Sequence, residues 1–514
     1  YSPQELSGVS EAVCRIKKAV ADNEKILIYG DYDVDGITSI ALLYNFFLKL
    51  GKRVDYFIPD RQFMGYGLNF ESLDRISSEG YKLIITVDCG ISNIEEVRRA
   101  NSLGIDVIIT DHHEPIAELP PAAAVINPKK PGETYPFKSL AGVGVAFKLF
   151  QRLLYDFDFS DHFIYSNLDI VALGTIADIV PLVGENRIIA RYGLKKMRKS
   201  DNLGLNALIR VAGVSADEIE SSDVAFVLAP RINACGRIDD PRLAVRLLTT
   251  EDKEEAAFLA KKLDEINRKR QQIEAGIMEE AESQIRECHL DEYSGLVLHS
   301  DRWHAGVIGI VTSKLKEKYY RPVILISVES GTGRASARSI TGFALHRELA
   351  ECSELLEKFG GHEMAAGFTI KNENISRFIE KFQTLITRNL GENLPDPVLS
   401  IDRELDFSDI SHDLISQIDI LAPFGMGNPQ PLFITRDVRL IDAGLVGSNQ
   451  RHLKLKVNSS SKTFGCIGFN LADHFSSLNP GHQNIDIAYH LSLNNYHDEP
   501  VIQLKIKDLS QTHF

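Results

Sequence analysis

Asp111, His112 and His113 follow one another at the end of a β-branched apolar run, residues 107–110. A run of this kind predicts a buried strand of a parallel sheet, and ligand sites in such sheets lie outside the carboxyl ends of the strands. Carboxylates and imidazoles together bind divalent cations such as Mn²⁺, Mg²⁺ and Zn²⁺. The stretch therefore predicts a metal site at a sheet edge.

Three further apolar segments also end in acids. Asp33 and Asp35 follow residues 25–29, Asp88 follows residues 83–87, and Asp178 follows a helical stretch at residues 168–177. For any one of these acids, capping of the following helix is an open alternative. The five aspartates and two histidines together are more ligands than one ion needs. We therefore expect two cations, Mn²⁺ or Mg²⁺, in a site that supports in-line displacement at phosphorus.

A second group of residues has the chemistry to bind phosphate. Ser336, Arg338 and His362 offer donors from the C-terminal half, and Arg237 and Arg61 are further candidates. The guanidinium group suits this task because it is a charged, forked donor. The alternatives are a surface ion pair for each arginine, and for His362 a tight turn before a helix.

The elements that must position these residues follow from periodicity. Residues 24–130 alternate strand and helix, which predicts an α/β fold with a doubly wound parallel sheet. Residues 229–241 are rich in turn formers and are expected to form a loop, whereas residues 251–290 predict one long connecting helix. A smaller α/β domain follows, in which residues 333–339 and 359–367 are expected to be loops. Short alternating strands from about residue 395 predict a small all-β barrel or sandwich. The predicted domains are residues 1–215, 216–290, 291–385 and 395–514.

Composition narrows the class of protein. The formal net charge of −14 argues against a general nucleic-acid binder, although a local basic groove remains compatible with it. The six cysteines show no CxxC spacing, so neither a disulfide framework nor a zinc site is expected, and a reducing cytoplasm fits best. Cys89 is interpreted as a small residue in a strand-to-helix turn rather than as a nucleophile. No stretch is long and apolar enough to predict a membrane span.

The motifs together resemble those of a known family. The segments Asp33-Val34-Asp35-Gly36, Val87-Asp88, Asp111-His112-His113 and Ala177-Asp178 are similar to the four motifs of the DHH phosphoesterase superfamily. Ser336-Ala337-Arg338 and Gly360-Gly361-His362 resemble its associated DHHA1 domain. Residues 30–36, 233–237 and 423–429 resemble the branch of single-strand-specific 5′→3′ DNA exonucleases. This resemblance runs from about residue 5 to the end of the chain.

The resemblance implies roles for individual residues. The implied metal ligands are Asp33, Asp35, Asp88, His112 and Asp178, with Asp88 as a bridge. Asp111 and His113 complete the implied catalytic set together with Asp33 and His112, and His113 would contact either the scissile phosphate or a metal. Arg61, Arg237, Ser336 and Arg338 would bind phosphates, and His362 would lie on the facing DHHA1 wall. In related pyrophosphatases a metal-binding His stands where this chain has Tyr29, so one metal is expected to lack that ligand.

The implied function is hydrolysis of the phosphodiester nearest a 5′ end of single-stranded DNA, with release of 5′-mononucleotides, in recombination and repair. The barrel would be an OB-fold that binds the strand through stacking and a charged groove. The alternatives are a phosphodiesterase for short oligonucleotides or cyclic dinucleotides, and a non-catalytic scaffold. The resemblance also implies a cytoplasmic monomer that works with single-strand binding protein, a RecQ-type helicase and mismatch-repair factors.

Overall fold

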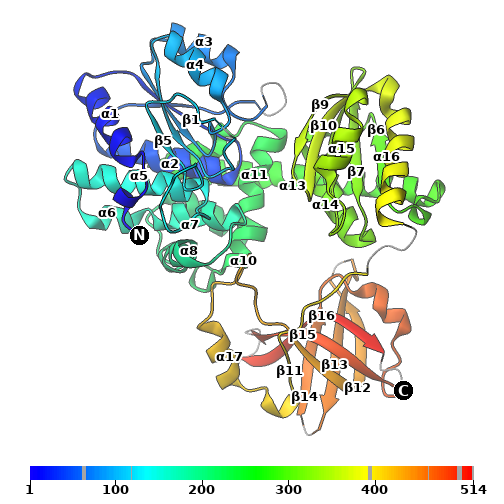
Figure 1. The fold of residues 1–514 in the computed structure, drawn as a ribbon. Helices are drawn as coiled ribbons and strands as arrows, with labels where there is room; N and C mark the ends of the chain where they lie inside the picture. The colour runs from blue at the N-terminus through cyan, green and yellow to red at the C-terminus, as the bar shows by residue number, and fades with distance from the viewer. Residues whose placement is uncertain are drawn as a thin grey trace. The chain divides into compact units, whose positions relative to one another are not determined.

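The computed structural model describes residues 1–60, 65–116, 118–391, 396–447, 449–460, 462–494 and 500–511. The chain divides into two compact units (Figure 1). Unit 1 comprises Tyr1–Val180 and Gly184–Pro397, and unit 2 comprises Pro181–Val183 and Val398–Phe514. In the part of the chain that is described, no helix is long and apolar enough to cross a membrane.

Unit 1 begins with the parallel sheet predicted from the sequence. Its strand order is β2-β1-β3-β4-β5, and every neighbouring pair is parallel. The strands are β1 (Ile26–Gly30), β2 (Asp55–Phe57), β3 (Leu83–Val87), β4 (Asp106–Thr110) and β5 (Ala124–Ile126). The register aligns Gly30 with Val87 and Val87 with Thr110, so these three strands end in one row. The strand order reverses between β1 and β3, and a crevice for ligands forms at such a switch point.

Helices cover both faces of this sheet. Side chains of α3 and α4 form one core with Leu27 and Tyr29 of β1, while α2 packs against β1 and β3 on the other face, and α5 packs against β3 and β4. Helix α7 packs in turn against α2, α5 and α8. The helices of this region are α1 (Val9–Ala21), α2 (Val34–Lys49), α3 (Phe70–Ser78), α4 (Ile94–Ser102), α5 (Gly142–Asp156), α6 (Asp161–Ser166), α7 (Leu168–Ala177) and α8 (Gly184–Met197).

The expected loop at residues 229–241 is wrong, because most of it is helix α11 (Ala229–Ile238). Pro230 lies at the helix start, where a missing N–H is tolerated. Gly236 lies inside this helix, where a Cβ would lie 2.4 Å from the carbonyl oxygen of Tyr32. Its small size therefore serves close packing, although it looks like a turn signal in the sequence. The neighbouring helices are α9 (Leu203–Ala212), α10 (Ser221–Asp223) and α12 (Arg242–Thr249).

The long connecting helix is present as α13 (Lys253–Glu287), which packs against α9, α11 and α12 and against α14 (Ala305–Tyr319). It leads to a second sheet with the order β6-β7-β8-β10-β9. The strands are β6 (Leu296–Ser300), β7 (Val323–Glu329), β8 (Thr332–Arg338), β9 (Leu356–Gly361) and β10 (Ala365–Lys371). Helix α14 packs against β7 and β8, whereas α15 (Leu345–Glu351) and α16 (Ile375–Leu390) share a core with the sheet.

The two donor-rich stretches of this domain were expected to be loops, and this is also wrong. Residues 332–338 form β8, and His362 lies in the turn that joins β9 to β10. In β8 the small residues Gly333, Ala335 and Ala337 pack among neighbouring strands, with Gly333 against Ile326 and Ile370. Small residues in this strand serve sheet packing, although in the sequence they suggest a flexible segment.

Unit 2 is a closed five-stranded barrel, as the alternating C-terminal pattern predicts. The strands pair in the order β12-β13-β14-β16-β15, and β15 pairs back with β12 to close the barrel. The elements of this unit are β11 (Arg403–Glu404), α17 (His412–Asp419), β12 (Phe433–Val446), β13 (His452–Ser459), β14 (Lys462–Gly468), β15 (Asn484–Asn494) and β16 (Val501–Gln511). Strand β12 is longer than the short strands expected from the sequence, and its pairing with β15 shifts register between Thr435 and Val438.

The glycines of residues 423–429 allow close packing in unit 2. The Leu182 amide donates a 2.7 Å hydrogen bond to the Met426 carbonyl. A Cβ on Gly425 would lie 2.7 Å from Leu182, and one on Gly427 would lie 2.9 Å from Pro181. Gly427 also has a φ of +69°, which an L residue adopts only with strain. This motif therefore holds residues 181–183 within unit 2.

Candidate metal centre

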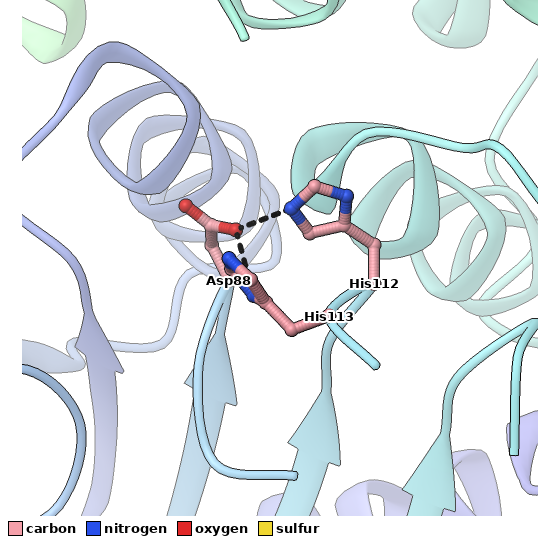
Figure 2. Close-up of side chains that lie close together, drawn as sticks. All are labelled: Asp88, His112 and His113. Carbon is pink, nitrogen blue, oxygen red and sulfur yellow. Dashed lines mark ion pairs between the residues drawn. The ribbon is translucent and has the colours of Figure 1, made fainter. Parts of the chain in front are cut away.

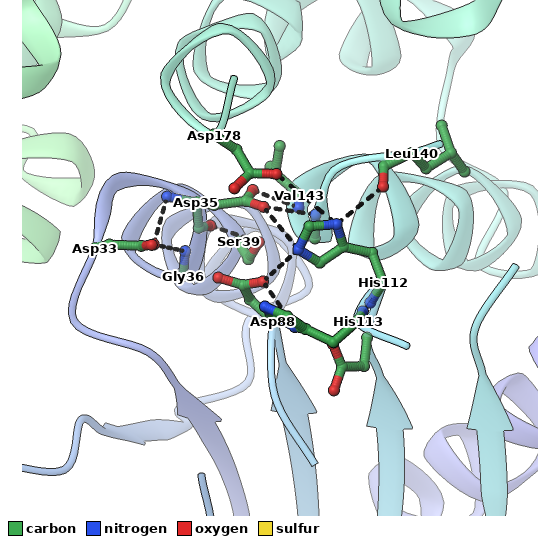
Figure 3. Close-up of polar contacts among 12 residues, drawn as sticks. Asp33, Asp35, Gly36, Ser39, Asp88, His112, His113, Leu140, Val143 and Asp178 are labelled. Carbon is green, nitrogen blue, oxygen red and sulfur yellow. Dashed lines mark hydrogen bonds and ion pairs between the residues drawn. The ribbon is translucent and has the colours of Figure 1, made fainter. Parts of the chain in front are cut away.

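The predicted ligands come together at the carboxyl edge of the first sheet (Figure 3). Asp33 and Asp35 follow β1, Asp88 follows β3, and His112 and His113 follow β4. Asp178 comes from a different element, as the C-cap residue that directly follows α7. The shared register of β1, β3 and β4 explains why residues far apart in sequence meet here.

Asp33 and Asp35 are fixed by backbone amides. Asp33 caps α2, and its Oδ1 accepts hydrogen bonds from the amides of Asp35 at 2.9 Å and Gly36 at 3.1 Å. The capping alternative is therefore correct for Asp33, although both bonds use the same oxygen. Asp35 is buried, and its oxygens accept from the amides of Gly142 at 2.6 Å and Val143 at 2.7 Å, at the start of α5.

His112 presents an unprotonated nitrogen to two carboxylates. Its Nδ1 donates a 3.1 Å hydrogen bond to the Leu140 carbonyl, so the neutral ring has no proton on Nε2. That nitrogen lies 3.2 Å from Asp88 Oδ1 and 3.9 Å from Asp35 Oδ2 (Figure 3). Burial, followed by the charge of His113, lowers the pKa of His112 to about 4. A ring nitrogen held this way by a backbone carbonyl is the usual arrangement of a metal-ligating histidine.

Among the described residues, none donates a hydrogen bond to Asp88 Oδ1 or to Asp178 Oδ2, and both oxygens are buried. Burial, followed by the charges of Asp35 and Asp33, raises the pKa of Asp178 to about 9. Burial, followed by the charge of Asp33, raises the pKa of Asp35 to about 7. Burial and Asp35 raise that of Asp88 well above its ordinary value. These carboxylates repel one another, and they face the lone pair of His112 Nε2. A divalent cation bound among them would neutralise this repulsion.

Three overlapping sets of ligand atoms have the spacing to hold cations among the described residues. One is Asp88, His112 and His113 (Figure 2). The others are Asp35 with His112 and Asp178, and Asp31 with Asp33 and Asp88. Within each set the atoms lie within 4.8 Å of one another. Asp88 and His112 each belong to two sets, which fits the expectation that Asp88 bridges two ions.

Asp31 was missed by the sequence reasoning. It directly follows β1 and is buried, and it joins Asp33 and Asp88 in the third set. Asp31 could have been predicted, because it follows the same strand as Asp33 and Asp35.

Asp111 binds the protein rather than facing the cluster. Its Oδ1 accepts from His113 Nδ1 at 2.7 Å and from the amides of His112 and His113, and its Oδ2 accepts from the Ile91 amide at 2.9 Å. Burial would raise the pKa of Asp111, but the hydrogen bonds from His113 and Ile91 outweigh it and lower the pKa. Burial would lower the pKa of His113, but its hydrogen bond with Asp111 and the charge of Asp111 outweigh burial and raise the pKa.

Two further residues that contact the cluster were also missed. A Cβ on Gly142 would lie 2.5 Å from Asp88 Oδ1, so any side chain here would have to displace the Asp88 carboxylate. Tyr66 donates a 2.7 Å hydrogen bond to the Asp88 carbonyl and lies 3.0 Å from His113 Nδ1. Tyr66 lies in a loop and Gly142 at the start of a helix, and neither segment has a periodic sequence pattern that would predict its position.

Cys89 and Tyr29 take part in the fold beside the cluster. Burial and Asp111 raise the pKa of the Cys89 thiol well above its usual range, which fits its interpretation as a small turn residue. The Tyr29 hydroxyl donates to the Gly67 carbonyl at 3.0 Å and accepts from Asn69. Its hydroxyl is therefore occupied by the protein where pyrophosphatases would have a metal-binding His.

The predicted phosphate-binding residues of the second domain lie around α14. Arg338 donates to Ser336 Oγ at 3.3 Å and to Ser313 Oγ at 3.1 Å, and both Arg338 and Ser336 border Gly309. Arg237 donates to the Gly306 carbonyl at 3.1 Å, at the start of the same helix. These three residues are therefore held along the first turns of one helix.

The other two predicted phosphate contacts are less defined by the structure. His362 is exposed, and its amide donates to the carbonyl of Ala365, the residue that pairs with Arg338 across the sheet. Arg61 lies outside the described residues, directly after Asp60. Asp60 and Arg237 both line a cavity of about 390 Å³.

Comparison with known proteins adds independent findings. The model of the DHH family N-terminal domain matches residues 25–175, the DHHA1 domain matches residues 292–388, and the RecJ OB domain matches residues 401–508. The single-stranded-DNA-specific exonuclease RecJ of Bacillus subtilis is 42% identical over 99% of this chain, which spans 64% of that protein's length. The RecJ of Escherichia coli is 37% identical over 98% of this chain and is covered to 91%.

A solved structure is similar over the same extent. RecJ of Thermus thermophilus in complex with Mn²⁺ superposes with a TM-score of 0.85 at 30% identity, covering 99% of this chain and 72% of that one. The Mg²⁺ complex of the same protein superposes with a TM-score of 0.79. The predicted fold class, with its DHH, DHHA1 and OB domains, is thereby confirmed, and so is the expectation of Mn²⁺ or Mg²⁺ as the metal of this family.

Proposed function

The chain belongs to the RecJ family of DHH phosphoesterases, and from this premise we propose that it is a metal-dependent exonuclease specific for single-stranded DNA. It hydrolyses the phosphodiester nearest the 5′ end and releases 5′-mononucleotides, in the service of recombination and repair. The observation that supports this most strongly is His112, whose proton-free Nε2 faces the carboxylates of Asp88 and Asp35. An unprotonated ring nitrogen beside two carboxylates has the chemistry to bind a divalent cation.

The residues at the sheet edge would hold two cations, Mn²⁺ or Mg²⁺. The proposed ligands are Asp33, Asp35, Asp88, His112 and Asp178, and the geometry adds Asp31. Once bound, the cations would neutralise the phosphate and lower the pKa of the attacking water. The amides of Gly142 and Val143 hold the Asp35 carboxylate in place before any ion arrives. This arrangement reduces the reorganisation needed during the reaction.

His113 is the residue we propose nearest the scissile phosphate. Its side chain is 46% exposed, whereas that of His112 is 10% exposed. Asp111 keeps a proton on His113 Nδ1 through a 2.7 Å hydrogen bond, which leaves Nε2 for the substrate. Asp111 therefore contributes by orienting His113, since both of its oxygens already accept hydrogen bonds from the protein.

Arg237, Ser336 and Arg338 would bind the phosphates of the strand. Arg338 is oriented by Ser313 and Ser336, and Arg237 by the first turn of α14, so these donors are set before substrate binds. A preset guanidinium gives both charge and directional hydrogen bonds to a phosphate. We propose Arg61 and His362 as further phosphate contacts on the strength of their motifs.

The barrel of unit 2 would bind single-stranded DNA beyond the scissile bond. OB-folds bind strands through exposed aromatic side chains and basic groups, and unit 2 carries the half-exposed Phe469 beside His452, with ring centroids 5.3 Å apart. Single-strand binding protein, a RecQ-type helicase and mismatch-repair factors are proposed as protein partners, and the cytoplasm as the compartment.

The test is digestion of one long single strand labelled at its 5′ end and, separately, at its 3′ end, with Mn²⁺. We expect the 5′ label to appear at once as a mononucleotide, while the 3′ label stays on shortening strands. Asp178→Ala and Asp111→Ala should each abolish cleavage in folded protein. Full activity of either variant, or early release of the 3′ label, contradicts the proposal. Faster turnover of a dinucleotide than of the long strand would instead favour the small-substrate phosphodiesterase.

A further inference from the structure

Tyr66 contacts two parts of the metal centre at once, although no step of the proposed reaction uses it. It stands between β2 and α3, and its hydroxyl lies 2.7 Å from the Asp88 carbonyl and 3.0 Å from His113 Nδ1. Its ring packs edge-on against that of His113, with centroids 5.4 Å apart. The contacts join the backbone of a metal ligand to the side chain nearest the substrate.

The hydrogen atoms in this network can be assigned without ambiguity. The Asp88 carbonyl can only accept, so it takes the single O–H of Tyr66. The Tyr66 oxygen can then only accept from His113, whose Nδ1–H is shared with Asp111 Oδ1 at 2.7 Å. Tyr66 and Asp111 therefore select the same tautomer of His113, and each restricts rotation of the ring.

The backbone of Asp88 needs this support. Asp88 has a φ of +59°, in the left-handed region that a residue with a Cβ adopts only with strain. Its amide donates to the Thr110 carbonyl at 2.9 Å, and its carbonyl accepts from Tyr66. Because Asp88 belongs to two of the three candidate cation sets, a rotated peptide would displace a ligand of both.

We propose that Tyr66 is a positioning residue, whose hydroxyl holds the Asp88 peptide and the His113 ring in the arrangement that binds cations and phosphate. The effect on turnover rests on the proposed function, whereas the effect on cation binding does not. Tyr66 acts through Asp88 and His113, and its role requires no contact of its own with the metals.

The test compares Tyr66→Phe with Tyr81→Phe, two substitutions that remove one hydroxyl and keep the ring. The Tyr81 hydroxyl donates to Asp55 Oδ2 at 2.7 Å, in the same domain but outside the metal centre. Tyr66 is 45% exposed, so the loss of its hydroxyl should leave the protein folded, which thermal melting checks. Manganese binding is measured by calorimetry without DNA, and kcat and KM are measured on a long single strand.

For Tyr66→Phe we expect the dissociation constant for Mn²⁺ to rise and kcat to fall, each by about 10- to 100-fold, as for other residues that orient metal ligands. We expect KM for the strand to stay within about twofold of the wild-type value, and Tyr81→Phe to change none of the three. An Mn²⁺ affinity equal to that of Tyr81→Phe overturns the proposal, whatever happens to turnover. If the wild-type protein binds Mn²⁺ but degrades no strand, the proposed function fails, and the comparison of Mn²⁺ affinities still decides this inference.

Discussion

Asp178→Asn should stabilise the metal-free protein while it abolishes the proposed nuclease activity. Asp178 and Asp35 belong to one set whose ligand atoms lie within 4.8 Å of one another. Ionising both groups at this limiting separation would cost about 3.5 kcal/mol at an effective dielectric constant of 20. The folded protein therefore keeps a proton on Asp178, which lowers the stability of the wild type at pH 8 because the unfolded chain has lost that proton. The Asp178 side chain is 20% exposed, so solvent screening reduces this cost. We therefore expect a gain of roughly 1–3 kcal/mol in the free energy of unfolding at pH 8.

The pH dependence gives this prediction its sign. Burial, then Asp35 and Asp33, raise the pKa of Asp178 to about 9 from an ordinary value of 3.8. Between these two values the folded state holds a proton that the unfolded state has lost, so the stability of the wild type falls as pH rises. Asparagine does not titrate at this position. The advantage of Asp178→Asn should therefore be small near pH 4 and should grow up to about pH 9.

The assay is scanning calorimetry in EDTA from pH 5 to pH 8, followed by the same series with Mn²⁺. Asp217→Asn is the matched control, because it makes the same substitution at an exposed position in the short turn Ala216–Glu218. In Mn²⁺ the order should reverse, since the wild type gains stability from an ion that the variant binds poorly. The reasoning is refuted if Asp178→Asn melts below the wild type at pH 8 in EDTA, or if their difference does not change with pH.

Two other consequences follow from the same cluster. Binding of Mn²⁺ at pH 7 should release protons, because metal ligation requires ionised carboxylates and the pKa of Asp35 is raised to about 7 and that of Asp178 to about 9. Calorimetry in buffers of different ionisation enthalpy measures this proton release. The apparent affinity for Mn²⁺ should rise from pH 6 to pH 9, and an affinity that does not depend on pH would contradict the raised pKa values. Gly142→Ala should weaken Mn²⁺ binding and lower kcat by at least about 10-fold, because its Cβ would lie 2.5 Å from Asp88 Oδ1. The control is Gly276→Ala, at a position on α13 with open space around it. Equal activity of the two variants would show that the Asp88 carboxylate can move aside and would contradict this prediction.

The first sheet and the meeting of most candidate ligands at its edge could be predicted because they depend on one simple rule. Apolar runs of five residues become buried parallel strands, and in-register strands deliver whatever follows them to one edge. Asp88 and His112 are found by this rule, and Asp31 should have been. Tyr66 and Gly142 could not be found, because their place depends on how a loop and a helix start approach Asp88 in three dimensions.

The errors in secondary structure have a common cause. Gly236 and Gly333 look like turn signals in the sequence, yet one lies in a helix and the other in a strand. In both positions a Cβ would meet neighbouring atoms within 3 Å. Glycine chosen for close packing cannot be distinguished from glycine chosen for flexibility when only one sequence is read. The spacing of small residues in β8 was misread for the same reason.

Helix capping and metal ligation looked like competing explanations for the strand-end aspartates, but in this fold they support each other. Asp33 uses one oxygen, Oδ1, for both amides at the start of α2 and still belongs to a candidate cation set. Asp35 is held in the same way, by amides at the start of α5. The positive ends of two helices thus offset part of the repulsion among buried carboxylates. Asp88 Oδ1 and Asp178 Oδ2 receive no hydrogen bond from any described residue. The raised pKa values of Asp88 and Asp178 show that repulsion remains at these residues, and a cation bound there would relieve it.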